Sequence, residues 1–234
     1  MNARVDVEKH NEVQRRYYGG AVKRRMLPSD SPYINRQLDR LLAFGGVGPA
    51  DRVLEIGCGM GRYTLPLLKR GIRVEGIDLS PVLLDRLRSV AGDDAADLTL
   101  YCADVIEHPP ELTGRFDAVI GFFMLHHVHR LDLLFRAVRA LLAPGGRALF
   151  LEPNAYCALY YIQILSMPDM TWEGDKGVVK MRRRPIFRAF ESAGLRRPVM
   201  ERFGFFPPFV ANRPWAQPLE TALVLFPLWR PFLP

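Results

Sequence analysis

Cysteine is scarce in this sequence, and no long apolar run occurs in it. The three cysteines, Cys58, Cys102 and Cys157, lack the paired C-x-x-C spacing of structural zinc sites and disulfide frameworks. We therefore expect no metal site and a cytoplasmic location. The N-terminal segment is too charged for a signal peptide, and every apolar stretch is shorter than the roughly 18 residues of a spanning helix. These features predict a soluble protein and leave peripheral contact with a membrane open.

Acidic residues are fewer than basic ones, with 25 Asp and Glu against 32 Lys and Arg in 234 residues and a formal net charge of +7. Such an excess favours anionic partners such as a membrane surface, a phosphorylated substrate or RNA. The densest clusters, Lys23 to Arg25 and Arg182 to Arg184, are short, and we interpret each as a solvated or locally paired face. Hydrophobic residues make up 49% of the chain, which is ordinary for a globular protein and argues against disorder.

The central part of the chain alternates short apolar runs with segments of helical period, which is the pattern of βαβ units on a parallel sheet. It predicts an α/β fold, Rossmann-like and doubly wound, with helices on both faces of a mostly parallel sheet. We expect strands at 52–56, 73–77, 98–102, 116–121, 147–151 and 195–203, and helices at 63–69, 132–142, 184–193, 219–226 and directly after Ser80.

The flanks differ from this core in composition. Residues 1–50 are predicted to form a helical cover or lid, and residues 51–204 the core, with an aromatic acceptor-lid insertion at about 153–181. Residues 205–234 form an apolar tail whose seven prolines exclude a long regular element. No convincing seventh strand follows, so the chain either lacks one or is cut before one.

The strongest local signal is V-L-E-I-G-C-G-M-G at residues 53–61, a strand that leads into Gly57, Gly59 and Gly61. Glycines allow the backbone to turn tightly and to approach a ligand closely. Asp78, 21 residues after Gly57, ends the next strand at the offset where a carboxylate reaches the ribose hydroxyls of a nucleotide. Both features suit nicotinamide dinucleotides and S-adenosylmethionine alike.

The loop spacing separates these two ligands. A dinucleotide loop reads G-x-G-x-x-G and directs a helix toward pyrophosphate, whereas this loop reads G-x-G-x-G and follows Glu55. A carboxylate is poorly matched to two phosphates, but it suits an ammonium and a sulfonium. Electrostatics therefore favour S-adenosylmethionine.

Five segments together resemble the successive motifs of class I methyltransferases: 53–61, 76–80, 103–105, 116–128 and 142–153. The strings M-L-H-H-V and L-L-A-P-G-G-R-A-L-F-L-E-P are similar to the branch that includes the ubiquinone and menaquinone biosynthesis methyltransferases. The resemblance implies S-adenosylmethionine as the cofactor, S-adenosylhomocysteine as its product, and a small-molecule acceptor.

The same resemblance implies roles for individual residues. Gly57 and Gly59 would lie beneath the methionine part, Glu55 would hold its amino group, and Asp78 would bind the ribose. Asp104 would accept from the adenine amine. The remaining candidate cofactor-binding residues are Cys58, Gly61, Tyr63, Leu79, Val105, Phe122 and, in the N-terminal lid, Tyr18.

Candidate catalytic residues are fewer. His126 and His127 follow the fourth strand, and either could take the proton that a hydroxyl or an acidic carbon loses on methylation, or could serve as a structural hydrogen-bonding group. Tyr156, Tyr160, Tyr161 and Trp172 would line an apolar pocket or belong to the core. With the apolar tail, they favour an apolar or lipid-linked acceptor.

Three alternatives stay open. An RNA methyltransferase fits the basic charge, but the N-P-P-Y type string of enzymes that methylate exocyclic base amines is absent after the fourth strand, so we expect no nucleic-acid partner. A non-catalytic S-adenosylmethionine-binding protein and a nicotinamide oxidoreductase would share the fold. The acceptor, the atom methylated and the oligomeric state are left undetermined by the sequence.

Overall fold

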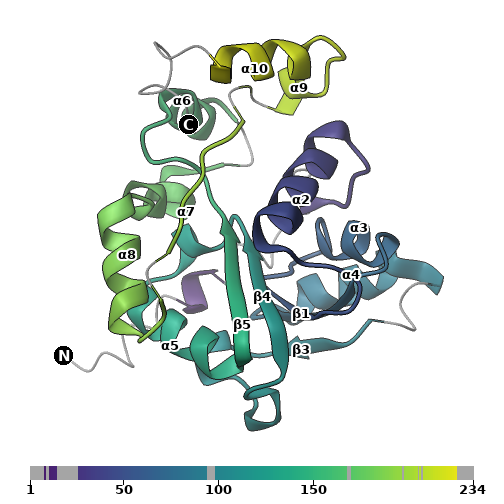
Figure 1. Ribbon diagram of the computed structural model, residues 1–234, viewed down its shortest axis with the longest axis vertical. Coiled ribbons are helices and arrows are strands. Elements are labelled where there is room, and N and C mark those ends of the chain that lie inside the picture. The colour runs from purple at the N-terminus through teal and green to yellow at the C-terminus, as the bar shows by residue number, and fades with distance from the viewer. Residues whose placement is uncertain are drawn as a thin grey trace.

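Five parallel strands form one sheet at the centre of the computed structural model (Figure 1). The structure describes residues 8, 11–14, 26–93, 98–167, 170–196, 198–204, 206 and 208–225. The order across the sheet is β3-β2-β1-β4-β5, so the strand order reverses between β1 and β4, where open α/β sheets bind ligands. The predicted fold class is confirmed. The strands are β1 (Arg52–Ile56), β2 (Arg73–Asp78), β3 (Leu100–Cys102), β4 (Phe116–Phe122) and β5 (Leu142–Leu151).

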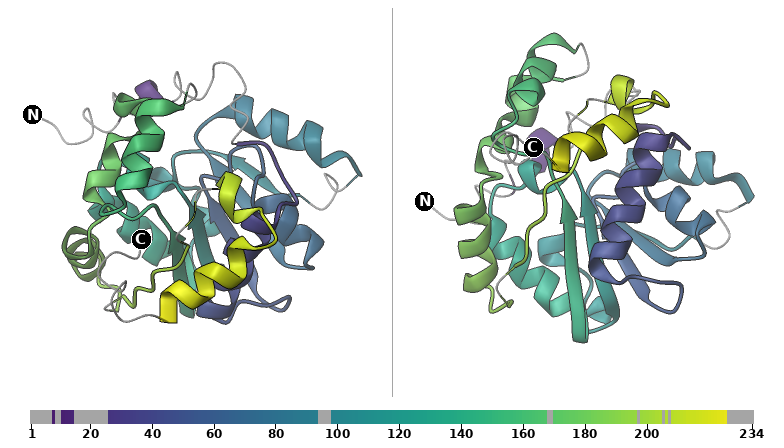
Figure 2. Two further views of the ribbon diagram at one scale, coloured as in Figure 1. Left: turned by 90° about the horizontal axis from the view of Figure 1, so that it is seen from above. Right: turned by 45° about the horizontal axis from the view of Figure 1, so that its top comes forward.

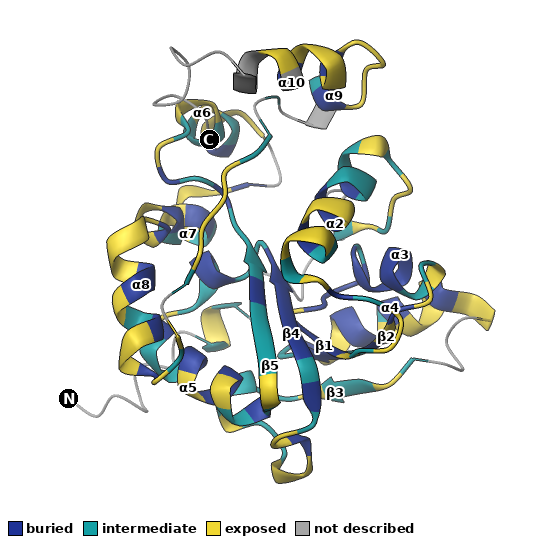
Figure 3. Ribbon diagram, in the orientation of Figure 1, coloured by how far each residue is buried: buried dark blue, intermediate teal, exposed yellow. Residues whose placement is uncertain are grey.

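The central strands are buried on both faces (Figure 3), which explains their nearly continuous apolar sequences. In β1, Ile56 pairs with Ile77 of β2 on one side and with Gly121 of β4 on the other. This register brings the carboxyl ends of all three strands to one edge of the sheet. Residues that directly follow these strands therefore meet there.

Helices cover both faces of the sheet, as the two further views show (Figure 2). The helices fall into two groups. The first group packs on the face of the sheet that includes Val53, Val74 and Ile120, and the second packs on the face that includes Leu54 and Val119. Ser31 and Ser80 begin two helices, each accepting a hydrogen bond from a backbone N–H of the first turn. The first group comprises α2 (Pro32–Gly45) and α3 (Thr64–Lys69), flanked by α4 (Pro81–Ala91), and the second comprises α5 (Leu131–Leu141) and α8 (Arg183–Ser192).

Short helices lie above the carboxyl edge of the sheet (Figure 1). They are α6 (Ala158–Ser166), α7 (Trp172–Asp175), a 3₁₀ helix (Lys176–Lys180), α9 (Pro208–Ala211) and α10 (Ala216–Leu225). The last two are tied to α2: the Tyr33 N–H donates to Asn212 Oδ1 at 3.0 Å, and Arg36 forms an ion pair with the buried Glu220. Among the described residues, no helix is both long and apolar enough to cross a membrane.

Two predictions about strands need correction. The described residues of 195–203 form no strand: Pro198 has no N–H to offer a ladder, and the Val199 side chain is 76% exposed. β5 begins at Leu142, earlier than expected, because Leu142 already pairs with Phe116 before a shift in register.

Candidate active site

A cavity of about 1610 Å³ opens at the carboxyl edge of the sheet. Ligand pockets commonly measure about 300–1,000 Å³, so this one has room for more than one small molecule. Acidic side chains and the glycine loop line one end, called here the cofactor end. Aromatic and aliphatic side chains around β4, β5, α6 and α8 line the other, called here the acceptor end.

The glycine loop exposes its backbone to the cofactor end. Gly57 and Gly59 have φ angles of 69° and 54°, in the left-handed region that favours glycine. A Cβ at Gly57 would lie 3.1 Å from Cβ of Met124. A residue with a side chain at this position would crowd Met124 and the turn.

Asp78 links the two loops of the cofactor end. Its Oδ2 accepts from the Gly59 N–H at 2.9 Å, and its Oδ1 accepts from the Ser80 N–H at 2.8 Å. Burial raises the pKa of this carboxyl, and the two N–H groups act in the opposite direction. Asp78 thus shapes the loop, while each oxygen keeps a second lone pair that could accept from a ribose hydroxyl.

Glu55 is the most deeply buried acid of the cofactor end, with 2% of its surface exposed. Its Oε2 accepts from the Thr64 hydroxyl at 2.7 Å. Burial raises the pKa of Glu55 to about 8, and the charge of Asp78 adds to the rise. A cation entering this end would be stabilised by the ionised form.

Asp104, Val105 and Leu79 also line this end. Asp104 uses both carboxylate oxygens: Oδ1 accepts from the Ile106 N–H at 2.9 Å and Oδ2 from the Asn11 side-chain amide at 2.5 Å. The contact with Asn11, 93 residues away in the chain, could not be read from the sequence. It attaches a turn of the N-terminal region to the site.

Tyr63 and Phe122 both line the cavity and form one aromatic wall of it. Their rings stack with centroids 4.0 Å apart and an angle of 7° between the planes. The Tyr63 hydroxyl donates to Gln37 Oε1 at 2.6 Å, which ties the wall to α2, and burial raises its pKa. Cys58 is buried beside the loop, and burial raises the pKa of its thiol, so it acts as an apolar wall.

Two of the candidate residues stand apart. Gly61 has a φ of 81°, but it does not line the cavity; a Cβ there would lie 2.2 Å from Leu87 Cδ1. Its position is therefore explained by packing of the loop against α4. Tyr18 lies outside the described residues.

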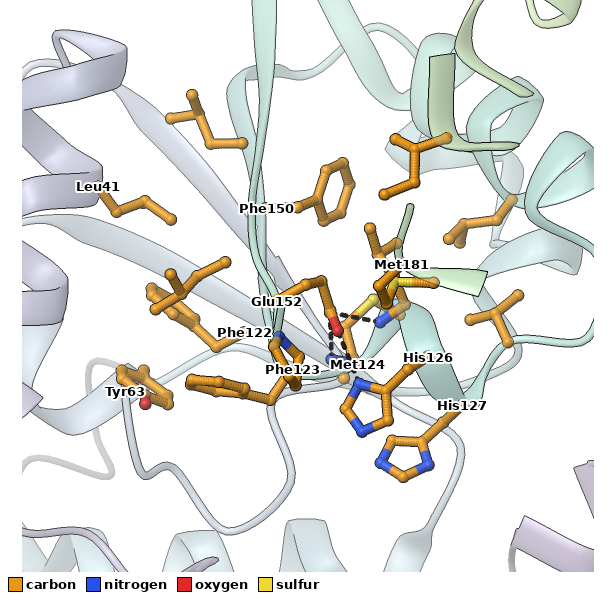
Figure 4. A pocket seen from close by; sticks show the side chains of 18 of the residues that line it. Leu41, Tyr63, Phe122, Phe123, Met124, His126, His127, Phe150, Glu152 and Met181 are labelled. Carbon is orange, nitrogen blue, oxygen red and sulfur yellow. Dashed lines mark hydrogen bonds and ion pairs between the residues drawn. The ribbon is translucent and has the colours of Figure 1, made fainter. Parts of the chain in front are cut away.

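His126 is held by a carboxylate that the sequence analysis missed. Glu152, which directly follows β5, accepts from the N–H groups of Met124 and Leu125 at 2.7 and 2.6 Å, and its Oε2 lies 2.6 Å from His126 Nδ1 (Figure 4). His126 is only 5% exposed. The signal available in the sequence was the position of Glu152 at a strand end beside β4.

His127 lies closer to the open part of the cavity than His126. Its Nδ1 is 3.0 Å from the Gly174 carbonyl oxygen, so in the neutral ring Nδ1 carries the proton and Nε2 carries the lone pair. The two histidine rings are 3.9 Å apart, and the buried Asp175 lies 3.9 Å from His126 Nε2. Possible ligand atoms of His126, His127 and Asp175 lie within 4.8 Å of one another, a grouping that could hold a metal ion and that the sequence did not predict.

The acceptor end is built from aromatic side chains of separate segments. Phe122, Phe123 and Phe150 line it, and Phe123 has a φ of 52°, a conformation uncommon for a residue with a side chain (Figure 4). Of the four aromatic residues expected in the lid, Tyr156 and Tyr160 line the cavity, whereas Tyr161 and Trp172 do not.

Residues 53–146 match the family described as "Methyltransferase domain". A ubiquinone biosynthesis O-methyltransferase of Chromobacterium violaceum is 26% identical over 161 residues, which cover 69% of this chain and 68% of that protein. A highly reducing polyketide synthase of Emericella nidulans is 29% identical over 179 residues, but the chain spans only 7% of its length.

The fold recurs in the structure of geranyl diphosphate C-methyltransferase from Streptomyces coelicolor A3(2), solved with Mg²⁺, geranyl diphosphate and S-adenosyl-L-homocysteine. The TM-score is 0.54 and the identity is 20%, with 79% of this chain and 78% of that chain covered. At this identity the likeness speaks for the fold alone.

Proposed function

We propose that this chain, whose residues 53–146 form a class I S-adenosylmethionine-dependent methyltransferase domain, transfers a methyl group to a small molecule with a large apolar part. The resemblance drawn from the sequence motifs is confirmed at the level of this domain. The identity of the acceptor goes beyond it and is our inference.

One observation supports the proposal above all others: a single cavity joins the acidic cofactor end to the aromatic acceptor end, and Tyr63 and Phe122 form one wall of it. Methyl transfer requires the acceptor atom to lie in line behind the methyl carbon, so the two sites must be continuous. A pure binding module would need only the cofactor end.

The charges of the cofactor end suit S-adenosylmethionine. Glu55 offers an anion for its ammonium group, and Arg62 offers a cation for its carboxylate. Arg62 Cζ lies 5.8 Å from the centroid of the Tyr63 ring. Burial raises the pKa of the Tyr63 hydroxyl, the charge of Arg62 lowers it, and the charge of Glu55 raises it further. In this proposal Asp78 accepts from the ribose hydroxyls and Asp104 from the adenine amine.

When bound, the cofactor would supply an electrophilic methyl carbon on a sulfonium, and its sulfur would be left as a neutral thioether. The acceptor loses a proton in exchange, and we assign His127 Nε2 as the atom that takes it. The Gly174 carbonyl fixes the tautomer of this ring. His126, held by Glu152 and packed against His127, positions it.

The acceptor end supports the apolar class of acceptor. Met181, Ile186, Phe187 and Phe190 line it together with Phe150, and all four are buried. We propose that α6, α7 and the tail helices form the lid over this end, with residues 51–204 as the catalytic core. The scarcity of cysteine supports a cytoplasmic location for this activity.

Calorimetry and a radiolabel assay test the function. We expect S-adenosylhomocysteine to bind, and labelled methyl from S-adenosylmethionine to appear in an apolar hydroxylated aromatic acceptor but not in RNA. Binding without turnover across a broad acceptor panel would favour a non-catalytic binding protein. Absence of any binding heat would overturn the proposal.

A further inference from the structure

A short helical turn, Asn11 to Gln14, contributes polar side chains to the cofactor end. Asn11 and Gln14 are three residues apart, so they lie on the same side of the turn. Both line the cavity, together with Asp104 and Val105. The turn is anchored by the hydrogen bond from the Asn11 amide to Asp104 Oδ2.

Within the part of the chain that the structure describes, Gln14 Oε1 accepts no hydrogen bond. The atom is buried, and no hydrogen-bond partner for it exists among the described residues. Leaving a buried acceptor unsatisfied is unfavourable, so such an atom beside a cavity points to a ligand that donates to it. The neighbouring Asp104 carboxylate is likewise an acceptor.

Two acceptors at one end of a cavity suit a primary amine, which has two N–H groups. A single acceptor satisfies one N–H group, and the other still needs a partner. The exocyclic amine of adenine presents both N–H groups in the plane of the ring. We propose that Gln14 accepts the second N–H of the cofactor's adenine amine, while Asp104 accepts the first. This inference rests on the proposed function for the presence of adenine.

Asn11 then has a distinct role. It does not contact the adenine in this scheme; its amide holds the turn on Asp104 and so positions Gln14. Asn11 is therefore a positioning residue, and removing it should have the same consequence as removing the Gln14 amide. The two substitutions together should do little more than either alone, because they act on one interaction.

Calorimetry with two ligands tests the proposal without turnover. The ligands are S-adenosylhomocysteine and its 6-deamino analogue, in which hydrogen replaces the amine. We expect Gln14→Leu to weaken binding of S-adenosylhomocysteine about tenfold and to change binding of the deamino analogue less than twofold. Asn11→Ala should reproduce this pattern, and the double variant should match the single ones.

Val13→Ala is the matched control, because Val13 lies on the same turn and is 51% exposed. It should bind both ligands as the parent does. Equal weakening of both ligands by Gln14→Leu, or no change in either, would overturn the inference. Failure of the parent to bind S-adenosylhomocysteine at all would instead refute the proposed function, so the two failures are distinguishable.

Discussion

The two ends of the cavity are built in different ways. The cofactor end takes most of its groups from three short stretches, 55–63, 78–80 and 104–105, each of which lies at or just beyond the carboxyl end of a strand. The acceptor end collects side chains from β4, β5, α6 and α8 and from the chain beyond α8. Where strand ends supply the side chains of a site, the local sequence determines the site. Where separate segments supply them, the packing of those segments determines it.

The largest expected effect concerns the free energy of unfolding and how burial of Glu55 in the cofactor end makes it depend on pH. The folded-state pKa of Glu55, about 8, lies above its ordinary value, so the folded protein keeps a proton that the unfolded chain has lost. Stability should therefore fall as pH rises from about 5 to 8. Glu55→Gln removes this dependence, and the variant should gain about 4 kcal/mol over the parent across that range.

Urea unfolding of both proteins at a series of pH values measures this difference. The amide of the variant can still accept from the Thr64 hydroxyl, so the two chains differ mainly in charge. Parallel stability curves would mean that Glu55 is solvated, and the contrast between the two ends would lose its electrostatic basis.

The next effect isolates the acceptor end. His127→Ala removes the proposed proton acceptor and should lower kcat about 10²- to 10³-fold while leaving the affinity for S-adenosylhomocysteine unchanged. Glu152→Gln should lower kcat less, because it only loosens His126. Single-turnover kinetics and calorimetry give the two readouts. A parallel loss of cofactor affinity would show that the two ends cannot be separated.

Asp78→Ala isolates the cofactor end. It removes a ribose acceptor and leaves the N–H groups of Gly59 and Ser80 without their partner, so S-adenosylhomocysteine should bind about 100-fold more weakly. Asp85→Ala is the control, since Asp85 lies exposed on α4 and pairs with Arg88. Calorimetry compares them, and equal affinities in the two variants would contradict the assignment.

The smallest expected effect is a difference in stability and cofactor affinity between substitutions at Gly59 and Gly61, two glycines of one loop. Gly61→Ala places a Cβ against Leu87 and should destabilise the protein by about 2 kcal/mol, with little loss of cofactor affinity. Among the described residues, a Cβ at Gly59 meets only Met26 Cε, at 3.6 Å, so Gly59→Ala should cost about 1 kcal/mol of stability and weaken cofactor binding. Thermal unfolding and calorimetry together check the pair, and identical profiles would contradict it.

The sequence predicted the sheet and the cofactor end because both depend on short-range patterns. Strand periodicity located β1, β2 and β4, and the glycine spacing placed Asp78 beside Gly59. It could not predict that Glu152 and Asp175 meet His126, since three separate segments must fold together first. The proposed sixth strand failed because an apolar run cannot reveal whether a neighbouring strand will pair with it.

Phe123 directly follows β4. Its left-handed backbone costs about 1 kcal/mol relative to glycine, and its N–H is held by the Leu151 carbonyl at 2.8 Å. The backbone of the turn between β4 and the two histidines is therefore strained. On gradual heating, this corner should relax before the sheet does, and amide exchange at Phe123 should speed up ahead of exchange at Val119.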